Sequence, residues 1–209
     1  MLTQQEQDIF QDIAETGLIE SLRALTKLSG RQWSAFLNPF AFATMREAKS
    51  SFSPLEPPRF AAQLNLDGEI PMRILCVFPQ ESAITLVHFL TAGMEPPPAV
   101  SSIQSQTVAE VANIISNAFL GVIANTLKLR LLASAPQPLS GTPVEILTAA
   151  SANDAAETEC ALSTELRLES ENLTMAGTLY ILVNAGALKN LVSRIHGSPA
   201  WTLKRFRIF

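Results

Sequence analysis

Three consecutive prolines, Pro96–Pro98, stand at the midpoint of the chain and constrain its organisation more than any other feature. A helix cannot continue through such a run and a central strand cannot contain it, because proline lacks the backbone N–H and has a fixed φ. The run divides the 209 residues into two nearly equal halves. Both halves show the same order of patterns, so we predict one domain over residues 1–209, made of repeats 1–95 and 101–209.

Each half opens with a long helical pattern. Apolar or small residues recur every three or four positions along residues 8–28 and 106–126, and they would form one buried face on each helix. These residues are Phe10, Ile13, Ala14, Gly17, Ser21, Ala24, Leu25 and Leu28 in the first half, and Val108, Val111, Ala112, Ile115, Phe119, Val122 and Ile123 in the second. The opposite face of each helix would be exposed.

Two β-rich segments and a second helical pattern follow in each half. We predict strands at 58–66 and 73–78 in the first half and at 160–168 and 177–183 in the second. Antiparallel strands covered by the long helices give a two-layer α+β fold. Tandem duplication of an α-β-β-α unit gives this fold pseudo-twofold symmetry.

Composition excludes several classes of protein. A chain with 47% hydrophobic and 16% charged residues is not disordered, and a net charge of −4 without a basic block does not indicate a nucleic-acid partner. The segment Met1–Asp8 lacks the features of a signal peptide, so we expect a cytoplasmic protein. Residues 111–127 carry no formal charge, but Asn113, Ser116, Asn117 and Asn125 favour a buried helix over membrane insertion.

Motifs for common active sites are missing. The sequence contains no GxGxxG, GxxxxGK or HExxH pattern, and His88 and His196 are its two histidines. Cys76 and Cys160 stand far apart, with no CxxC pattern. The sequence therefore predicts no metal site and gives no indication of a Ser-His or Cys-His nucleophile.

The second long helix carries a polar stripe opposite its apolar face. Gln106, Glu110, Asn113 and Asn117 recur at i, i+4, i+7 and i+11, which places them on one side of a helix. Gly121 continues this stripe and leaves the ridge low, so that the backbone of a partner could approach closely. Taken alone, the same pattern also fits an ordinary solvated helix face.

The segment Glu110-Val111-Ala112-Asn113 followed by Pro136 resembles the signature of the CheC/CheX/FliY phosphatases of bacterial chemotaxis. That signature is Asp or Ser, three residues, Glu, two residues, Asn, twenty-two residues and Pro. The Glu-x-x-Asn element and the gap of twenty-two residues both match, and the chain has CheC-like length and two similar halves. Gln106 departs from the signature, because the family has Asp or Ser there.

The resemblance implies a CheC-like fold and an enzyme that removes the aspartyl phosphate of a CheY-type receiver. Asn113 would position the attacking water, and Glu110 would pair with the lysine of the receiver. Gln106, Asn117 and Gly121 would contact the partner, and Pro136 would shape a loop. The receiver supplies its own Mg²⁺, so the resemblance implies no metal or cofactor of this chain. The deamidase CheD, which CheC proteins bind, is a second candidate partner.

The first half has lost the site that the resemblance implies for the second. A shift of 98 positions places Asp8, Asp12 and Glu15 at the positions of Gln106, Glu110 and Asn113. The carboxamide is thereby replaced by a carboxylate, which would repel a phosphoryl anion. Pro39 also lies one residue late for the proline of the signature. We therefore expect one active site per chain.

A non-enzymatic interaction module of the chemotaxis or flagellar switch machinery is the alternative interpretation. The middle domain of FliM is similar in fold to the CheC proteins and lacks the catalytic pair. Retention of Glu110 and Asn113 argues against this alternative. Binding of CheD is compatible with either interpretation.

Overall fold

The computed structural model describes residues 3–91, 100–151, 159–171 and 173–198. The first half contains α1 (Gln4–Ser29), β1 (Ser34–Leu37), β2 (Ala41–Thr44), α2 (Met45–Ser50), β3 (Arg59–Gly68), β4 (Met72–Pro79) and α3 (Gln80–Leu90). The second contains α4 (Val100–Leu127), β5 (Leu131–Ala133), β6 (Gln137–Gly141), α5 (Pro143–Ala150), β7 (Glu159–Ser170), β8 (Leu173–Asn184) and α6 (Ala185–His196). The proline run and the boundary between the predicted repeats lie outside the described residues.

Both halves have the element order α-β-β-α-β-β-α. The predicted α-β-β-α unit is present in each, formed by the long helix, the two long strands and the closing helix. A pair of short strands and a short helix, which the sequence patterns did not predict, stand between the long helix and the long strands. Each half is therefore an enlarged version of the predicted unit.

Within the described residues the strands form one eight-stranded antiparallel sheet with the order β1-β7-β8-β4-β3-β5. In addition, β2 pairs with β7 and β6 pairs with β3. The equivalent strands of the two halves are β1 and β5, β2 and β6, β3 and β7, and β4 and β8. If each strand is replaced by its equivalent, the order of the sheet reads the same in reverse. The short strands of each half thus pair with a long strand of the other half. This topology confirms the predicted duplicated fold with pseudo-twofold symmetry.

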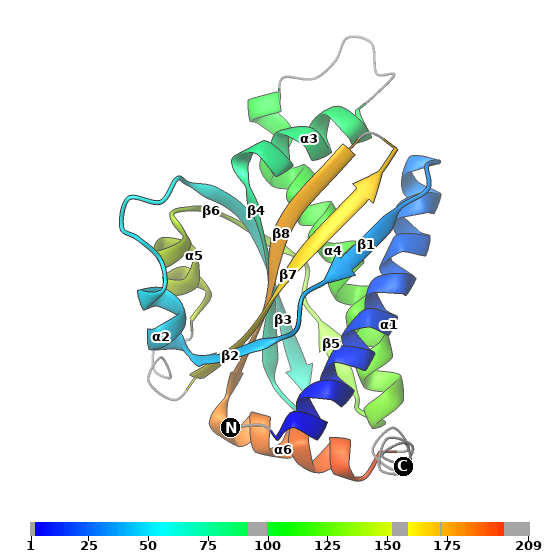
Figure 1. Cartoon of the computed structure of the whole chain (residues 1–209), viewed down its shortest axis with the longest axis vertical. Helices are drawn as coiled ribbons and strands as arrows, with labels where there is room; N and C mark the ends of the chain where they lie inside the picture. Colours follow the sequence, from blue (N-terminus) through cyan, green and yellow to red (C-terminus); the bar gives the residue numbers. More distant parts are fainter. Residues whose placement is uncertain (1–2, 92–99, 152–158, 172, 199–209) are drawn as a thin grey trace.

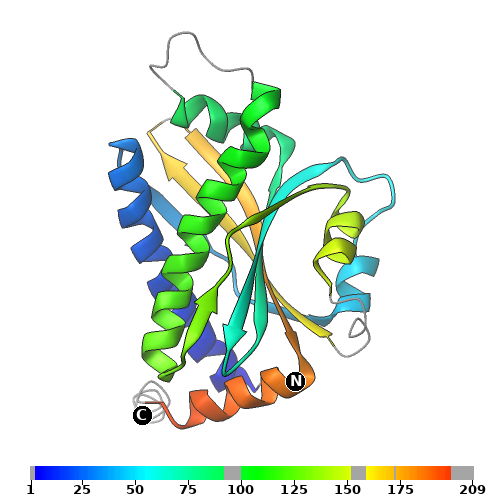
Figure 2. The same cartoon turned by 180° about the vertical axis from the view of Figure 1, so that it is seen from behind.

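The long helices α1 and α4 lie side by side and antiparallel on one face of the curled sheet (Figure 1). The main core lies between these helices and the sheet and contains Phe10, Ile74, Val111, Ile115 and Ile181. The short helices α2 and α5 lie on the other face, as the reverse view also shows (Figure 2). They cover a smaller core that contains Met45, Leu75, Ile146 and Tyr180. The predicted two-layer packing is confirmed, with part of the second face covered as well.

The crossing of α1 and α4 shows the symmetry at the level of single residues. A Cβ added at Gly17 would lie 2.7 Å from the Cα of Phe119, so the two backbones meet closely there. The Ser21 hydroxyl lies 3.4 Å from the carbonyl oxygen of Ile115. Adding 98 to Gly17 and Ser21 gives Ile115 and Phe119, so the twofold operation exchanges the two contacts. The shift inferred from the sequence therefore agrees with the packing.

The predicted apolar faces are buried along most of both helices. On α4, Val108, Val111, Ile115 and Ile123 are fully buried. Helix α4 is long and apolar enough to cross a membrane by composition, but much of it is buried between α1 and the sheet. Leu28 was predicted on the buried face of α1 and is 57% exposed, because it lies in the last turn of the helix on the wall of a surface groove.

Candidate functional site

Helix α4 presents the polar stripe on the side away from the core. Gln106, Glu110 and Asn117 are exposed and Asn113 is half-buried. The opposite side of the same turns is held by the buried residues Val111 and Ile115, which belong to the main core. Because these apolar residues fix the rotation of the helix, the sheet and α1 together determine which way the stripe faces. The spacing of Glu110 and Asn113 places the two side chains next to each other on the surface of one helical turn.

The carboxamide of Asn113 is held by Asn117, one turn further along α4. The Nδ2 atom of Asn117 donates to the Oδ1 atom of Asn113 at 2.7 Å and to the backbone carbonyl oxygen of Asn113 at 2.9 Å. The sequence analysis predicted a partner contact for Asn117 and did not predict this contact within the helix. The spacing i, i+4 of two amide side chains is the signal that could have indicated it.

Gly121 continues the stripe toward the end of α4. It is exposed, and a Cβ added there would meet no atom within 4 Å among the contacts described. The ridge of α4 is therefore low at this position, as the sequence indicated. Its contact with a partner stays a prediction.

Pro136 lies on a different element from the other signature residues. It is half-buried in the connection between β5 and β6, and both strands pair with β3. Pro136 therefore does not lie in the connection from α4 to the next strand, because α4 ends at Leu127 and β5 intervenes. Ser134, two residues before Pro136, is tied to β3, because its hydroxyl accepts from the backbone N–H of Asn65 and its own N–H donates to the Asn65 carbonyl oxygen. A loop-shaping role for Pro136 stays a prediction.

A groove of about 610 Å³ lies beside the first turns of the stripe. Gln106 and Glu110 form one side of it, and the end of α1 and the end of α3 form the other, where Figure 2 shows α3 beside the upper part of α4. Apolar side chains of Leu28, Phe89, Leu90 and Ile103 contribute to its lining. The sequence pattern did not indicate this groove, because its walls come from three separate helices.

Arg31 supplies a positive charge on the wall of this groove opposite Glu110. Its guanidinium lies 4.8 Å from the centre of the Phe89 ring, a cation–π contact, and 2.8 Å from a carboxylate oxygen of Glu171. The groove therefore combines an apolar floor with one charge of each sign. Such a lining suits a protein surface of mixed character.

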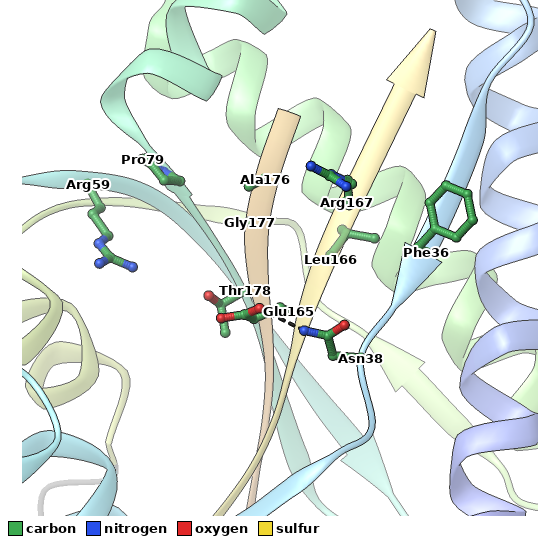
Figure 3. A pocket seen from close by; sticks show the side chains of 10 residues that line it. All are labelled: Phe36, Asn38, Arg59, Pro79, Glu165, Leu166, Arg167, Ala176, Gly177 and Thr178. Carbon is green, nitrogen blue, oxygen red and sulfur yellow. Dashed lines mark hydrogen bonds between the residues drawn. The ribbon is translucent and has the colours of Figure 1, made fainter. Parts of the chain in front are cut away.

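A second pocket, of about 430 Å³, lies on the open part of the sheet face opposite α4 (Figure 3). Asn38 and Glu165 are among its lining residues, and the Asn38 amide donates to the Glu165 carboxylate at 2.7 Å. Arg59 lies to one side of this pair and is bound to Glu56 at 2.6 Å. These polar groups thus bind one another, and the pocket has no contact with the stripe on α4.

The corresponding stripe on α1 has a different character. Asp8, Asp12 and Glu15 are exposed, as the shift of 98 positions predicts for surface residues. Gln11 donates to Glu15 at 2.9 Å, and Gln4 donates to Asp8 at 2.9 Å. At the position of Asn117 stands Ile19, which is 53% exposed. At three of these four positions α1 thus has an acidic or apolar side chain where α4 has an amide, and at the fourth Asp12 corresponds to Glu110.

Metal ligands do not gather anywhere in the part of the chain that is described. Among residues 3–91, 100–151, 159–171 and 173–198, no group of three or more His, Cys, Asp or Glu side chains could hold an ion. Cys76 is buried in the core, where burial raises the pKa of its thiol to about 12.

Comparisons with known proteins identify the fold. No protein-family model matches the chain, and no curated protein matches it in sequence. Among solved structures, FliY from Thermotoga maritima is similar with a TM-score of 0.72 at 15% identity, covering 94% of this chain and 98% of FliY. The FliM middle domain from H. pylori is similar with a TM-score of 0.63 at 11% identity, covering 92% of this chain and 99% of that one.

The chemotaxis protein CheX from Desulfovibrio desulfuricans is also similar, with a TM-score of 0.50 at 12% identity, covering 83% of this chain and 99% of CheX. The protein therefore has the CheC-like fold that the sequence resemblance implied. Sequence identities this low show the fold alone, and proteins of the chemotaxis and flagellar switch systems share it.

Proposed function

We propose that the protein is a cytoplasmic phosphatase that hydrolyses the aspartyl phosphate of a CheY-type receiver. The observation that supports this most strongly is the pair Glu110 and Asn113, adjacent on the outer side of α4 in a CheC-like fold. The packing that turns these two side chains outward is the same packing that builds the core. A partner can therefore reach both without any rearrangement of the fold.

Asn113 positions the attacking water. A carboxamide cannot act as a general base, but its oxygen can accept a hydrogen bond from water while its NH₂ donates to a phosphoryl oxygen. This holds the water in line with the bond that breaks, and the phosphoryl charge is neutralised by the Mg²⁺ and lysine of the receiver. If positioning of the water accelerates the reaction on the order of a hundredfold, it lowers the activation free energy by about 2.7 kcal/mol.

Glu110 fixes the register of α4 over the acid pocket of the receiver. Its carboxylate is one turn from Asn113 and exposed, so it can form a charge-assisted contact with the lysine of the receiver. The groove beside it receives the adjoining surface of the receiver, with Gln106 on the same wall. Gly121 faces the partner further along α4.

A non-enzymatic module is the alternative that a specific observation favours. The FliM middle domain shares this fold over nearly its whole length. An adaptor of this kind would use the same groove and helix to bind a receiver, a flagellar switch component or CheD, and it would not hasten hydrolysis. The two proposals differ in turnover and not in binding.

The test compares turnover with binding. Loss of aspartyl phosphate from CheY-type receivers is measured with wild-type protein, Asn113→Ala and Glu110→Ala, and affinity is measured with receivers activated by beryllofluoride. We expect Asn113→Ala to lower turnover about a hundredfold with affinity preserved. Glu110→Ala should lower both, because it removes a charged anchor.

Two controls complete this test. Asn125→Ala removes an exposed asparagine from the same helix, outside the stripe of Glu110 and Asn113, and should leave turnover and affinity unchanged. Chelation by EDTA should abolish turnover only through the receiver, so that preincubating the phosphatase alone with EDTA and then removing it has no effect. A wild-type protein that binds the activated receiver and leaves its phosphate untouched would establish the adaptor instead.

A further inference from the structure

We propose that Asn117 is a positioning residue that fixes which end of the Asn113 carboxamide faces the receiver. This inference rests on the proposed phosphatase function and assigns to Asn117 a role other than partner contact. It follows from the two hydrogen bonds between the residues and from the chemistry of their atoms.

The backbone carbonyl oxygen of Asn113 determines how Asn117 is oriented. A carbonyl oxygen can only accept hydrogen bonds, so the atom of Asn117 that lies 2.9 Å from it must be the NH₂ nitrogen. The same nitrogen lies 2.7 Å from the carboxamide of Asn113. A donor there requires an acceptor, so Asn113 turns its Oδ1 atom toward Asn117.

The NH₂ group of Asn113 is therefore the end that points away from Asn117. No hydrogen bond within the described part of the chain uses it, and the side chain is half-buried, so part of it reaches the surface. The Oδ1 atom keeps a second lone pair after it accepts from Asn117. One carboxamide can then accept from the attacking water through Oδ1 and donate to a phosphoryl oxygen through Nδ2.

Without Asn117 the two ends of the carboxamide become interchangeable. A terminal amide torsion has two broad orientations, and no other described contact selects between them. In the reversed orientation Oδ1 would face the phosphoryl oxygens, which are anionic, and the water would lose its acceptor. Turnover would fall because part of the population is misdirected, while the surface that binds the receiver stays the same.

The experiment separates this role from partner contact. Turnover and affinity for the beryllofluoride-activated receiver are measured for Asn117→Ala, Asn117→Gln and the matched control Asn125→Ala. We expect Asn117→Ala to lower kcat about tenfold with affinity within about twofold of wild type. Asn117→Gln keeps an NH₂ donor on the same helical face and should recover most of the turnover that alanine loses.

Three results would overturn the inference: kcat of Asn117→Ala within about twofold of Asn125→Ala, a loss of affinity as large as the loss of turnover, or a loss of turnover that Asn117→Gln does not recover.

A second measurement, of the mobility of the Asn113 side chain by NMR, does not depend on turnover. The side-chain amide signals of Asn113 are identified in the free protein by their absence in Asn113→Ala. They should report a more mobile side chain in Asn117→Ala and an unchanged one in Asn125→Ala. If wild-type protein is inactive the proposed function fails, and this signal still decides whether Asn117 holds Asn113.

Discussion

Helices α1 and α4 occupy equivalent places in the fold and carry different surfaces. They cross at Gly17 and Phe119, and the symmetry of the fold exchanges the residues of the crossing. Their buried faces therefore pack in the same way in both halves. Their outer faces differ, since Asp12, Glu15 and Ile19 stand on α1 at the places of Glu110, Asn113 and Asn117 on α4. The comparison shows that packing preserves a helix while leaving its exposed chemistry free to change.

The surfaces around the two stripes differ as well. Gly121 leaves open space on α4, whereas the equivalent position on α1 is Arg23. Arg23 forms an ion pair with Glu20, and both side chains are exposed. A partner approaching α1 at this point would meet a long charged side chain in place of a bare helix. The side-chain chemistry and the height of the surface thus both differ between α1 and α4.

The largest expected effect comes from giving α4 the residue of α1. Asn113→Glu puts the side-chain type of Glu15 in the place of the carboxamide. We expect turnover to fall by more than about a hundredfold, because the variant loses the carboxamide that we propose orients the water, and its added anion repels the phosphoryl group. Turnover is measured by decay of the phosphorylated receiver, and circular dichroism checks that the variant folds. A folded variant with more than a tenth of the activity would show that Asn113 is not essential.

A second effect concerns the stability of the two helices. Gly17→Ala introduces a Cβ that would lie 2.7 Å from the Phe119 Cα, and we expect it to lower the free energy of unfolding by about 1–2 kcal/mol. Gly121→Ala is the matched control, because its Cβ has open space, and it should raise that free energy by about 0.5–1 kcal/mol. Urea denaturation measures both. Equal effects of the two substitutions would contradict the close crossing.

A third effect is a pH dependence of the free energy of unfolding, which we expect from the first turn of α1 and not from the equivalent part of α4. Glu6 is buried at the start of α1, where Thr3 N–H donates to it at 2.6 Å and His196 Nε2 lies 2.7 Å away. Burial alone would raise the pKa of Glu6, but these hydrogen bonds outweigh it and hold the pKa below its usual value. Glu6 therefore stabilises the fold above the ordinary glutamate pKa, and this contribution is lost as pH falls through the lowered folded value.

The equivalent position on α4 is Gln104, which is also buried and does not titrate. We expect Glu6→Gln to lower the free energy of unfolding by about 1 kcal/mol at neutral pH. The difference from wild type should shrink in acid, where Glu6 itself is protonated. Unfolding curves from pH 3 to pH 8 measure this. A difference that is constant over that range would show that the charge of Glu6 does not contribute.

The smallest expected effect comes from the stripe on α1. The double variant Asp12→Ala and Glu15→Ala removes the acidic pair, and we expect turnover to change by no more than about twofold, since exposed substitutions usually alter little. The assay is the decay of the phosphorylated receiver. A large loss in a folded double variant would show that α1 also catalyses or binds the partner.

Much of the fold could be predicted from the sequence. The spacing of apolar residues predicted α1 and α4, because a long amphipathic helix repeats its apolar positions over enough turns to be recognised. The long strands β3, β4, β7 and β8 were predicted to within a few residues. The repeat was visible because the order of these long elements is the same in both halves.

The short elements could not be found by periodicity. Strands β1, β2, β5 and β6 have three to five residues, too few to show alternation, and they form by pairing with long strands of the other half. Helices α5 and α2 have a local signal in the sequence that a search for periodicity does not use. Thr142 and Glu145 form a capping box with Pro143 in the first turn, and Thr44 and Glu47 do the same for α2.

The candidate site was only partly visible in the sequence. The positions of Glu110 and Asn113 follow from helical spacing, so their adjacency could be predicted. The contact of Asn117 with Asn113 depends on rotamers, and the groove depends on how α1, α3 and α4 pack. The i, i+4 spacing of the two asparagines permits their contact without determining it, and the packing of three helices leaves no signal in the pattern of any one of them.

The most direct test of the account is the half-life of a phosphorylated CheY-type receiver with and without this protein. The receiver is phosphorylated, freed of donor and mixed with a saturating amount of wild-type protein in Mg²⁺, and its aspartyl phosphate is followed over time. We predict a half-life shortened on the order of a hundredfold, with Asn113→Ala restoring nearly the intrinsic decay. An unchanged half-life across all receivers of the host, with the protein folded and in excess, would contradict the phosphatase account.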